Sequence, residues 1–472
     1  MAAASPCPLL ALHPAPLLRP LPRAARALHL GTFARGYAKE NGLSPFLPPP
    51  LKPGLDRLAA SAGAPLLQPP ATALSFVERG GPRKVSRLSL LKRHGQQRSS
   101  SISSLTWGSH HHHHHHSQHA VQREEIQADY LRWVARVGDK LARKRQYYTA
   151  NSTPEWAGEK KTAQQVNLYY SSDAVARVIT VSKNGHGRFK SVQAAINSIP
   201  SGNCERVVIQ IAAGVYQEKV KIPKKKPYIT FQGAASGRGE TVITWHDNAR
   251  SAGTTFKSAT VSVMSDGFIA KDITFSNTAP YPHPGSTDMQ AVAFQISGDK
   301  AALYNCRFLG TQDTLYDHKG RHYFRNCYIQ GSVDFIFGGG LSLYENCELR
   351  AIAKAYGSFT AQKRKSSGEE SGFSFVRCKL TGSGVLYLGR AWGPYSRVVF
   401  VLSYIDAQIV PDGWYNWGDY SRERTVFYGE YQCRGPGSNK KGRVVWSHQL
   451  SSAQAAPFMS LSFVDGEQWI AQ

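Results

Sequence analysis

The sequence predicts an all-β protein built as a right-handed parallel β-helix, a single-stranded solenoid preceded by a disordered N-terminal extension and carrying short helices. A short motif recurs at Tyr304–Phe308, Arg325–Ile329 and Glu345–Leu349, with a looser copy at Val376–Leu380. The cysteines of these copies are 21, 20 and 31 residues apart. A period near 20 with short strands in each copy indicates a coil of about three strands, stacked about 4.8 Å from its neighbour.

The individual strands follow from short β-branched and aromatic runs that end in Gly, Asn, Asp or Ser. A short helix is expected at Lys190–Ser198, where Val192, Ala195 and Ile196 share one face. The expected strands before the repeat are Val178–Val181, Arg206–Ile211, Tyr228–Gln232, Thr241–Trp245, Ala259–Met264 and Phe268–Asn277.

The recurring cysteines have two interpretations. In stacked coils, Cys306, Cys327 and Cys347 form an internal ladder of small apolar side chains. Cys347 and Cys378 could instead form a disulfide, because stacked positions lie near bonding distance. The sequence contains no CxxC motif, so a zinc ribbon or a thioredoxin-type site is not expected.

The organisation of the chain divides into four parts. Residues 1–120 are rich in Pro, Ala, Ser and Arg and are expected to be disordered, and 121–147 form an amphipathic helix. Residues 148–175 are a linker, and 176–472 are the β-helix. The tract His110–His116 could bind metal weakly or be a tag, but we favour a linker without a folded role.

The chain is basic in both halves. Its net charge is +25, and residues 171–472 alone contain 34 Lys and Arg against 23 Asp and Glu, or +11. This charge favours a polyanionic partner, either nucleic acid, anionic lipid or acidic polysaccharide, although an unspecialised basic surface is equally compatible. Without an RNA-recognition motif, zinc-finger spacing or basic-zipper heptads, we expect no nucleic acid. The sequence contains no run of 18 apolar residues, so no membrane-spanning helix is predicted.

Candidate chemistry comes from polar residues spaced by one coil. Asp313 and Asp334 are 21 residues apart, and Gln290 and Gln312 are 22 apart. With about 20 residues per coil, these four side chains are expected to stack on one face, although a coincidental polar row remains an alternative. Two carboxylates held close together repel, so one has a raised pKa and stays a proton donor while the other is a charged nucleophile.

Other candidate residues refine this site. Arg390 comes from a distant segment and would keep a carboxylate beside it ionised. There is no GxSxG nucleophile elbow, so a serine hydrolase is not expected. His318 and His322 flank the Asp313 loop, and we interpret them as surface or groove residues without a metal role. Neither a metal nor a cofactor is expected.

The motifs together resemble those of plant pectin methylesterases, the carbohydrate esterases that demethylate pectin. Ile329–Gly338 matches the active-site signature of that family throughout, Gly214–Glu218 matches its GxYxE element, and Gly185–Phe189 resembles its opening coil. The resemblance covers roughly residues 176–470. Thr311 stands where many relatives have an aromatic residue and Ala391 where many have proline, differences that concern fine specificity and not the reaction.

The resemblance implies catalytic roles at matching positions. Asp334 attacks the methyl-ester carbonyl of a galacturonate residue, and Asp313 protonates the departing methanol and then activates water. Gln312 and Gln290 donate hydrogen bonds to the oxyanion, and Arg390 orients Asp334.

The resemblance also implies substrate contacts and partners. Trp392, Phe337 and Tyr316 would line the groove, together with Trp414, and Thr260 matches a substrate contact. Gln290 and Arg390 would touch the substrate as well. The expected partners are methyl-esterified pectin and proteinaceous esterase inhibitors, and the expected state is a monomer. The substrate implies secretion to the cell wall, although the first 40 residues do not form a clean secretory signal.

Two alternatives belong to different classes. A catalytically silent β-helix that binds acidic polysaccharide should lack at least one of the Asp or Gln residues, and none is missing. A β-helical polysaccharide lyase would need calcium-binding carboxylate clusters and a Lys or Arg base. Calcium-independent release of methanol would separate the esterase from the lyase.

Overall fold

The computed structural model describes residues 175–470. The expected disordered extension 1–120, the helix 121–147, nearly all of the linker 148–175 and the tract His110–His116 lie outside the described residues. Among the residues described, no helix is both long and apolar enough to cross a membrane.

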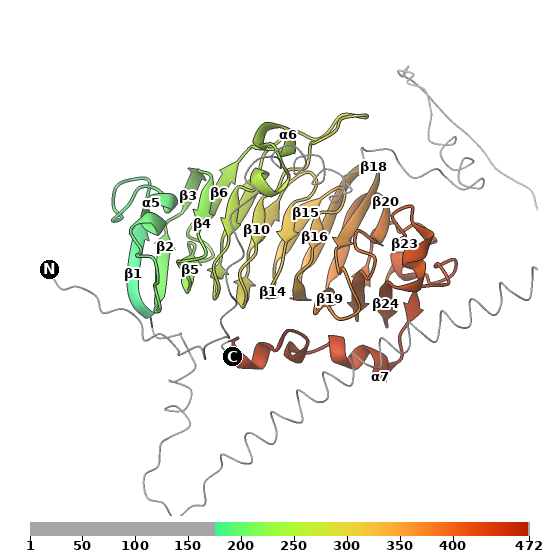
Figure 1. Cartoon of the computed structure of the whole chain (residues 1–472). Coiled ribbons are helices and arrows are strands. Elements are labelled where there is room, and N and C mark those ends of the chain that lie inside the picture. The colour runs from blue at the N-terminus through green and yellow to red at the C-terminus, as the bar shows by residue number, and fades with distance from the viewer. Residues whose placement is uncertain (1–174, 471–472) are drawn as a thin grey trace, which may run out of the picture. The chain divides into compact units, whose positions relative to one another are not determined.

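The described part of the chain winds through successive coils whose strands pair only in parallel (Figure 1). The first of its two sheets has 11 strands, ordered along the stack. They are β1 (Val175–Val181), β2 (Arg206–Ile211), β5 (Ile229–Gln232), β8 (Ile269–Lys271), β11 (Ala301–Tyr304), β14 (Arg321–Arg325), β17 (Leu341–Glu345), β19 (Gly372–Val376), β21 (Arg397–Val401), β24 (Phe427–Tyr431) and β25 (His448–Gln449).

The second sheet of residues 175–470 has 14 strands in two columns, joined by two long strands, β18 (Glu348–Gln362) and β20 (Lys379–Arg390). The first column contains β3 (Gly214–Gln217), β6 (Thr241–Trp245), β9 (Thr274–Asn277), β12 (Arg307–Leu309), β15 (Tyr328–Gly331) and β22 (Tyr404–Ile405). The second column contains β4 (Val220–Ile222), β7 (Val261–Val263), β10 (Phe294–Ile296), β13 (Leu315–Asp317), β16 (Ile336–Gly338) and β23 (Trp414–Tyr415).

Strand register confirms the predicted period. Arg307 of β12 pairs with Tyr328 of β15, and Leu315 of β13 pairs with Ile336 of β16, in each case 21 residues further along. Each complete coil therefore has one strand in the first sheet and one in each column of the second. The parallel β-helix predicted from the sequence is confirmed.

A left-handed residue turns the chain between the first sheet and the first column. Asn305, Asn326 and Asn346 have φ of 52°, 54° and 53° at this bend. Asn adopts this conformation more readily than most residues, which explains its recurrence in the repeat. The expected single strand Phe268–Asn277 is wrong because Asp272, with φ of 58°, makes the same bend and divides it into β8 and β9.

The residue after each bend points into the coil interior and forms the cysteine ladder. Cys306, Cys327, Cys347 and Cys378 are all buried and free. The ladder is confirmed, and the alternative disulfide between Cys347 and Cys378 is wrong. Beside the ladder, stacked aromatic rings fill the interior, such as Phe324 on Tyr344 with centroids 4.5 Å apart.

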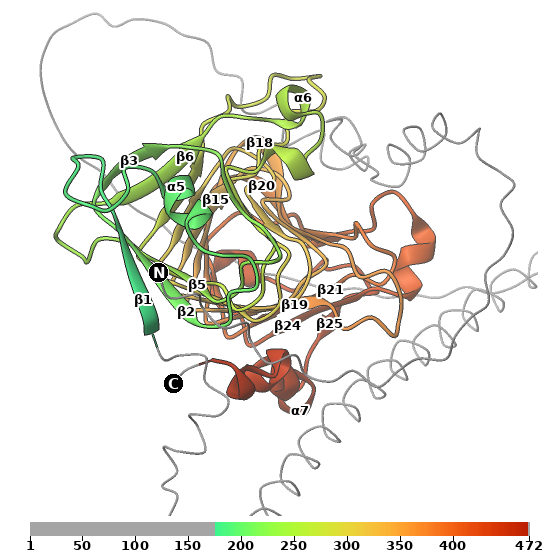
Figure 2. The ribbon, with the colours of Figure 1, turned by 60° about the vertical axis from the view of Figure 1, so that its left-hand side comes forward.

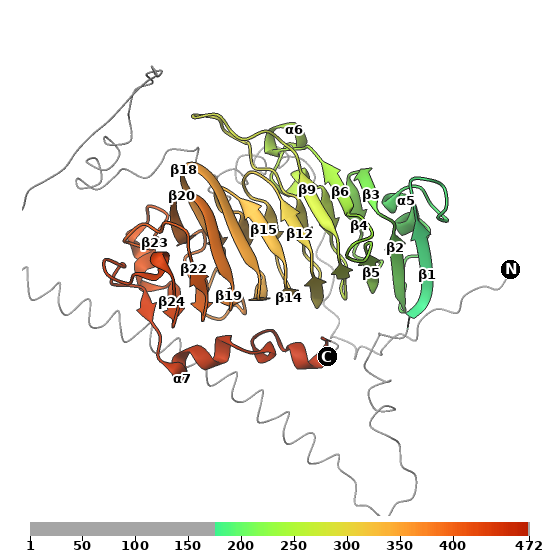
Figure 3. The ribbon, with the colours of Figure 1, turned by 180° about the vertical axis from the view of Figure 1, so that it is seen from behind.

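Short helices close the stack and cover one face. Helix α5 (Val192–Asn197) lies across the first coils (Figure 2), with Ser191 capping its N-terminus and Val192, Ala195 and Ile196 buried. At the other end the chain returns along the first sheet (Figure 3) and buries an apolar cluster against its outer face. The remaining helices of residues 175–470 are α6 (Ala249–Ala252), η1 (Phe256–Ser258), η2 (Tyr420–Arg424), η3 (Pro436–Ser438), α7 (Ser452–Ala455), η4 (Ala456–Phe458), η5 (Leu461–Val464) and η6 (Gly466–Gln468).

Candidate active site

The two predicted acids occupy equivalent turns on adjacent coils, directly before strands β13 and β16. Both are in the left-handed region, Asp313 with φ of 52° and Asp334 with φ of 49°. The Asp313 amide donates to the Val333 carbonyl at 3.1 Å, and the Leu315 amide donates to the Phe335 carbonyl at 2.9 Å. These bonds stack one turn on the other, so the coil period brings the two acids together as predicted.

Asp334 is held from both sides. Arg390, at the end of β20, donates from Nε to Oδ1 at 2.9 Å and from Nη2 to Oδ2. Ser358 of β18 donates its hydroxyl to Oδ1 and accepts from the Asp334 amide at 3.0 Å. The bidentate guanidinium pair places a positive charge against this carboxyl and, together with the Ser358 hydroxyl, leaves the side chain little rotational freedom.

Asp313 has a different environment. Its side chain is buried, and no hydrogen bond to it is found among the described residues. Burial and then the negative charge of Asp334 raise the pKa of Asp313 well above its usual range, while Arg390 partly opposes the shift. The neighbouring carboxyls thus differ: Asp334 is paired with a cation, whereas the surroundings of Asp313 favour its protonated form.

Both glutamines of the predicted site have buried polar atoms without a hydrogen-bond partner in the described residues. Gln312 is fully buried, and neither Oε1 nor Nε2 is bonded. Gln290 is 7% exposed, and its Oε1 is unpaired. Buried amides are normally satisfied, so unpaired ones immediately beside an acid pair are suited to bonding a substrate.

An aromatic row runs across the coils next to the acids. Tyr316 of β13 is in register with Phe337 of β16, and their rings stack with centroids 4.2 Å apart. Phe337 is 6.0 Å from the Trp392 ring. The structure thus brings together Tyr316, Phe337 and Trp392, which the sequence had placed in one groove.

The sequence reasoning missed three residues. Ser358 bonds Asp334, the Trp417 ring lies 4.3 Å from the Arg390 guanidinium carbon, and Phe256 contacts Tyr316 edge to face at 6.2 Å. Phe256 is 38% exposed. No motif marks Ser358 or Phe256. Trp417 lies in the same aromatic segment as Trp414, and the sequence analysis named Trp414 as the groove residue instead of Trp417.

Three expectations are corrected. Trp414 does not line a groove, because it is 1% exposed and stacks on Tyr428 in the core at 4.3 Å. Thr260 is fully buried, and its hydroxyl donates to the Ser276 carbonyl at 2.9 Å instead of facing a substrate. His322 is not a surface or groove residue, because it is fully buried.

His318 does lie beside the aromatic row, with its ring centroid 5.0 Å from that of Tyr316. Within residues 175–470 there is no cluster of three His, Cys, Asp or Glu side chains that could hold a metal ion.

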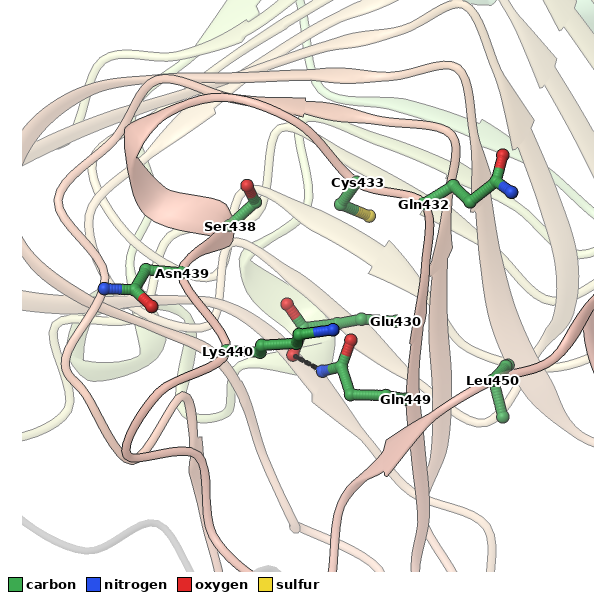
Figure 4. Close-up of a pocket in the computed structure, with 8 residues that line it drawn as sticks. All are labelled: Glu430, Gln432, Cys433, Ser438, Asn439, Lys440, Gln449 and Leu450. Atoms are coloured by element: carbon green, nitrogen blue, oxygen red, sulfur yellow. Dashed lines mark hydrogen bonds between the residues drawn. The ribbon is translucent and has the colours of Figure 1, made fainter.

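A polar cavity of about 460 Å³ lies apart from the acid pair, near the C-terminal coils (Figure 4). At its base, Gln449 donates to the buried Glu430 at 3.3 Å. None of the predicted site residues lines it. Its lining consists of Glu430, Gln432, Cys433, Ser438, Asn439, Lys440, Gln449 and Leu450.

Fold and site together define a β-helical hydrolase with a paired-carboxylate centre, and comparison with known proteins agrees. The pectinesterase family model matches residues 178–467. Pectinesterase QRT1 of Arabidopsis thaliana is 48% identical over 310 residues, which are 64% of this chain and 81% of that protein. The chain belongs to the pectinesterase family, and its activity is that of a pectin methylesterase.

Solved structures show the same fold. Pectin methylesterase from carrot is 37% identical with a TM-score of 0.58, and the match covers 62% of this chain and 94% of the carrot protein. A pectin methylesterase in complex with a hexasaccharide is 26% identical with a TM-score of 0.52, and the match covers 61% of this chain and 96% of that one. The predicted family, enzyme class and fold are confirmed.

Proposed function

We propose that this chain hydrolyses galacturonate methyl esters of pectin to de-esterified pectin and methanol through an acyl-enzyme on Asp334. One observation carries the proposal: two neighbouring carboxyls have opposite environments. Asp334 is paired with Arg390, whereas burial and the Asp334 charge raise the pKa of Asp313. A nucleophile must be an anion and a general acid must hold a proton, and this pair supplies both.

In the first half of the reaction, an Asp334 carboxylate oxygen attacks the ester carbonyl carbon, and the carbonyl electrons move onto oxygen. The tetrahedral intermediate collapses with loss of the methoxy group, which takes the Asp313 proton and leaves as methanol. The remaining acyl group is bonded to Asp334 as an anhydride. Asp313 is now a carboxylate, suited to act as a base.

In the second half, Asp313 removes a proton from water as the water oxygen attacks the acyl carbon. The anhydride bond breaks, Asp334 leaves as a carboxylate, and Asp313 is protonated again. The sum is one ester and one water converted to one acid and one methanol. No further reactant is required.

The unpaired Nε2 of Gln312 supports its role as an oxyanion donor, and we propose Gln290 as a second donor. A donor placed at the developing charge is typically worth about 3 kcal/mol of barrier. Gln312 directly precedes Asp313 and has no competing partner among the described residues. An amide without a ground-state partner can bond the oxyanion without first breaking another hydrogen bond.

The aromatic row supports an elongated sugar substrate. Phe256, Tyr316, Phe337 and Trp392 form a chain of ring contacts beside the acids. Phe256 and Trp392 are its more exposed members, on which sugar rings can pack, and the buried rings of Tyr316 and Phe337 support them from below. A structural neighbour, a pectin methylesterase, was solved in complex with a hexasaccharide, which supports an oligosaccharide substrate for this chain. We assign the enzyme to the cell wall, where this polymer occurs, and expect it to act as a monomer accessible to proteinaceous inhibitors.

The test is methanol release from esterified pectin by the full chain and its Asp334→Asn variant. We expect the variant to lose activity but still bind pectin. Asp272→Asn is the matched control, because it makes the same change at a left-handed residue (φ of 58°) on another bend. Retention of most activity by Asp334→Asn would rule out the nucleophile assignment.

The same assay separates the alternatives. A silent polysaccharide-binding protein would bind pectin and release no methanol in any variant. A lyase would form unsaturated uronates and depend on calcium. Methanol release in the presence of a calcium chelator is therefore the expected result.

A further inference from the structure

Arg390, whose guanidinium is paired with Asp334, is the last residue of strand β20. The chain turns directly after it. The Ala391 amide donates to the Tyr415 carbonyl at 2.9 Å, and the Trp392 amide donates back to the Arg390 carbonyl at 3.0 Å. The orientation of the Arg390 side chain therefore depends on how this turn is held at the end of the sheet.

Arg422 of helix η2 holds the turn through its main chain. Its Nη1 donates to the Ala391 carbonyl and, at 2.7 Å, to the Trp392 carbonyl. Its Nε donates to Asp419 at 3.2 Å, and its side chain is only 19% exposed. A charged donor makes stronger hydrogen bonds than a neutral one. One guanidinium thus ties η2 to the two residues that follow Arg390.

The connection between β23 and β24, to which Arg422 belongs, also contacts Arg390 directly. The Trp417 ring lies 4.3 Å from the Arg390 guanidinium carbon. Trp417 and Gly418 have φ of 63° and 75°, and a large aromatic residue rarely adopts this left-handed conformation. Asn416 secures the turn by accepting from the Gly418 amide at 2.9 Å. The connection therefore reaches Arg390 on two sides, through a ring and through the main chain.

Such support matters because the contact between Arg390 and Asp334 is directional. Arg390 Nε donates to Asp334 Oδ1 at 2.9 Å, and Nη2 donates to Oδ2. A planar guanidinium makes both bonds only when its plane is correctly oriented. A shift of about 1 Å in a catalytic group, caused by a residue away from the chemistry, can lower a rate up to about a hundredfold.

We propose that Arg422 is a positioning residue for the reaction: by holding the Ala391 and Trp392 carbonyls, it keeps the Arg390 guanidinium on Asp334. Arg422 acts through Arg390 and takes no part in bond making or proton transfer. This inference rests on the proposed function, in which Asp334 is the nucleophile.

The first experiment compares methanol release from esterified pectin by the unchanged full chain, Arg422→Met and Arg422→Lys. Met keeps an unbranched apolar stem but removes every donor. We expect kcat of Arg422→Met to fall about tenfold and KM to change much less, because the Asp334 contact acts in the chemical step. Arg422→Lys should restore part of kcat, because an ammonium carries three donors and can serve both carbonyls.

The control is Arg321→Met. Arg321 of β14 has a side chain 24% exposed and pairs with Asp299 and Asp465, but it lies on the first sheet. Melting temperatures measure what each variant loses in stability. We expect Arg321→Met to keep kcat even where it melts lower. If Arg422→Met kept kcat, or if both variants lost kcat equally, Arg422 would only stabilise the fold, and the proposal would be overturned.

The pH dependence of kcat/KM adds a readout that a loss of stability does not move. Burial and the charge of Asp334 raise the pKa of Asp313, and the charge of Arg390 opposes this shift. A less closely held Arg390 opposes it less, so the pKa of Asp313 rises further. Because Asp313 must be protonated in the first half of the reaction, the alkaline limb should lie at higher pH in Arg422→Met than in the unchanged chain or Arg321→Met. An unmoved limb would contradict the positioning role.

A last measurement needs no turnover. In protein labelled with ¹⁵N-arginine, the Nε proton of Arg390, bonded to Asp334 and beside the Trp417 ring, should exchange slowly with water. Its signal is assigned by its loss in Arg390→Lys. We expect exchange about tenfold faster in Arg422→Met than in the unchanged chain, as for a locally opened group. Equal exchange rates would overturn the inference. Absence of methanol release together with an Arg422-dependent exchange rate would overturn the proposed function alone.

Discussion

At the scale of single residues, the site depends on an uncommon backbone conformation. Asp313 and Asp334 both have positive φ, which costs a non-glycine residue about 1 kcal/mol or more. The cost is tolerated because stacked turns and the bonds from Arg390 and Ser358 fix the second acid. The two acids therefore have the same backbone conformation on adjacent coils.

Asp313 links activity to stability. Because its folded-state pKa is raised, the folded chain binds this proton more tightly than the unfolded chain. The free energy of unfolding contributed by Asp313 is therefore greatest below the ordinary aspartate pKa, about 3.9, and falls as pH rises toward the folded value. Asp313→Asn cannot ionise, so we expect it to melt higher than the unchanged chain at neutral pH.

Melting temperatures of both proteins across pH 4 to 8 check this expectation. The difference in melting temperature should widen as pH rises and nearly vanish at the acid end, while methanol release by Asp313→Asn is lost at every pH. A difference that stayed constant with pH would show that Asp313 is not the group responsible.

At the scale of elements, strands β13, β14 and β17 enclose a polar group that takes no part in the proposed reaction. Asp317 Oδ1 lies 2.5 Å from His322 Nδ1, and the Tyr344 hydroxyl donates to Asp317 Oδ2 at 2.7 Å. His322 Nε2 is 2.8 Å from the Gly298 carbonyl. All three side chains are fully buried, so this network fixes the register of three successive coils.

Breaking the network should lower the free energy of unfolding. His322→Phe keeps a ring of similar size but leaves the Asp317 carboxyl buried with one partner fewer, and removing one partner of a buried pair typically costs about 3–5 kcal/mol. Tyr344→Phe removes only a hydroxyl and should cost about 1–3 kcal/mol. Urea unfolding of the two variants measures these losses in the free energy of unfolding. Small losses of similar size in both variants would mean that the network contributes little to stability.

The same strands show which features of the fold and the site can be predicted from the sequence and which cannot. The coil period was readable because Asn–Cys recurs at a left-handed bend, and the period alone placed Asp313 beside Asp334. The burial of His322 and Trp414 was not readable. A strand of two to five residues has too few positions to show which alternate side chains face inward. Ser358 was missed because a lone serine in the long strand β18 carries no pattern.

At the scale of the whole molecule, the net charge of the β-helix matches the proposed substrate. The net charge of +11 on residues 171–472 suits a polymer that becomes more anionic as it is de-esterified. Such attraction is screened by salt, over about 8 Å at physiological ionic strength.

The outer face of the first sheet is apolar and is covered by the C-terminal segment. Val399, Val401 and Phe427 point outward from this sheet, yet they are buried under that segment. Phe458 of η4 is fully buried there, stacks on Phe427 with centroids 5.8 Å apart, and its carbonyl accepts from Ser374 Oγ at 2.7 Å. The segment thus completes a hydrophobic layer that the coils alone leave uncovered.

Phe458 should therefore stabilise the fold although it is far along the chain from the catalytic residues. Phe458→Ala removes a buried ring from a layer that cannot easily collapse, and we expect a loss of about 3–5 kcal/mol in the free energy of unfolding. Tyr420→Ala is the control, because Tyr420 is 80% exposed and should change stability by less than about 0.5 kcal/mol. Urea unfolding of the two variants decides the matter. If Phe458→Ala were as stable as the control, the C-terminal segment would be a passive cover, and the sheet would need no layer over its apolar face.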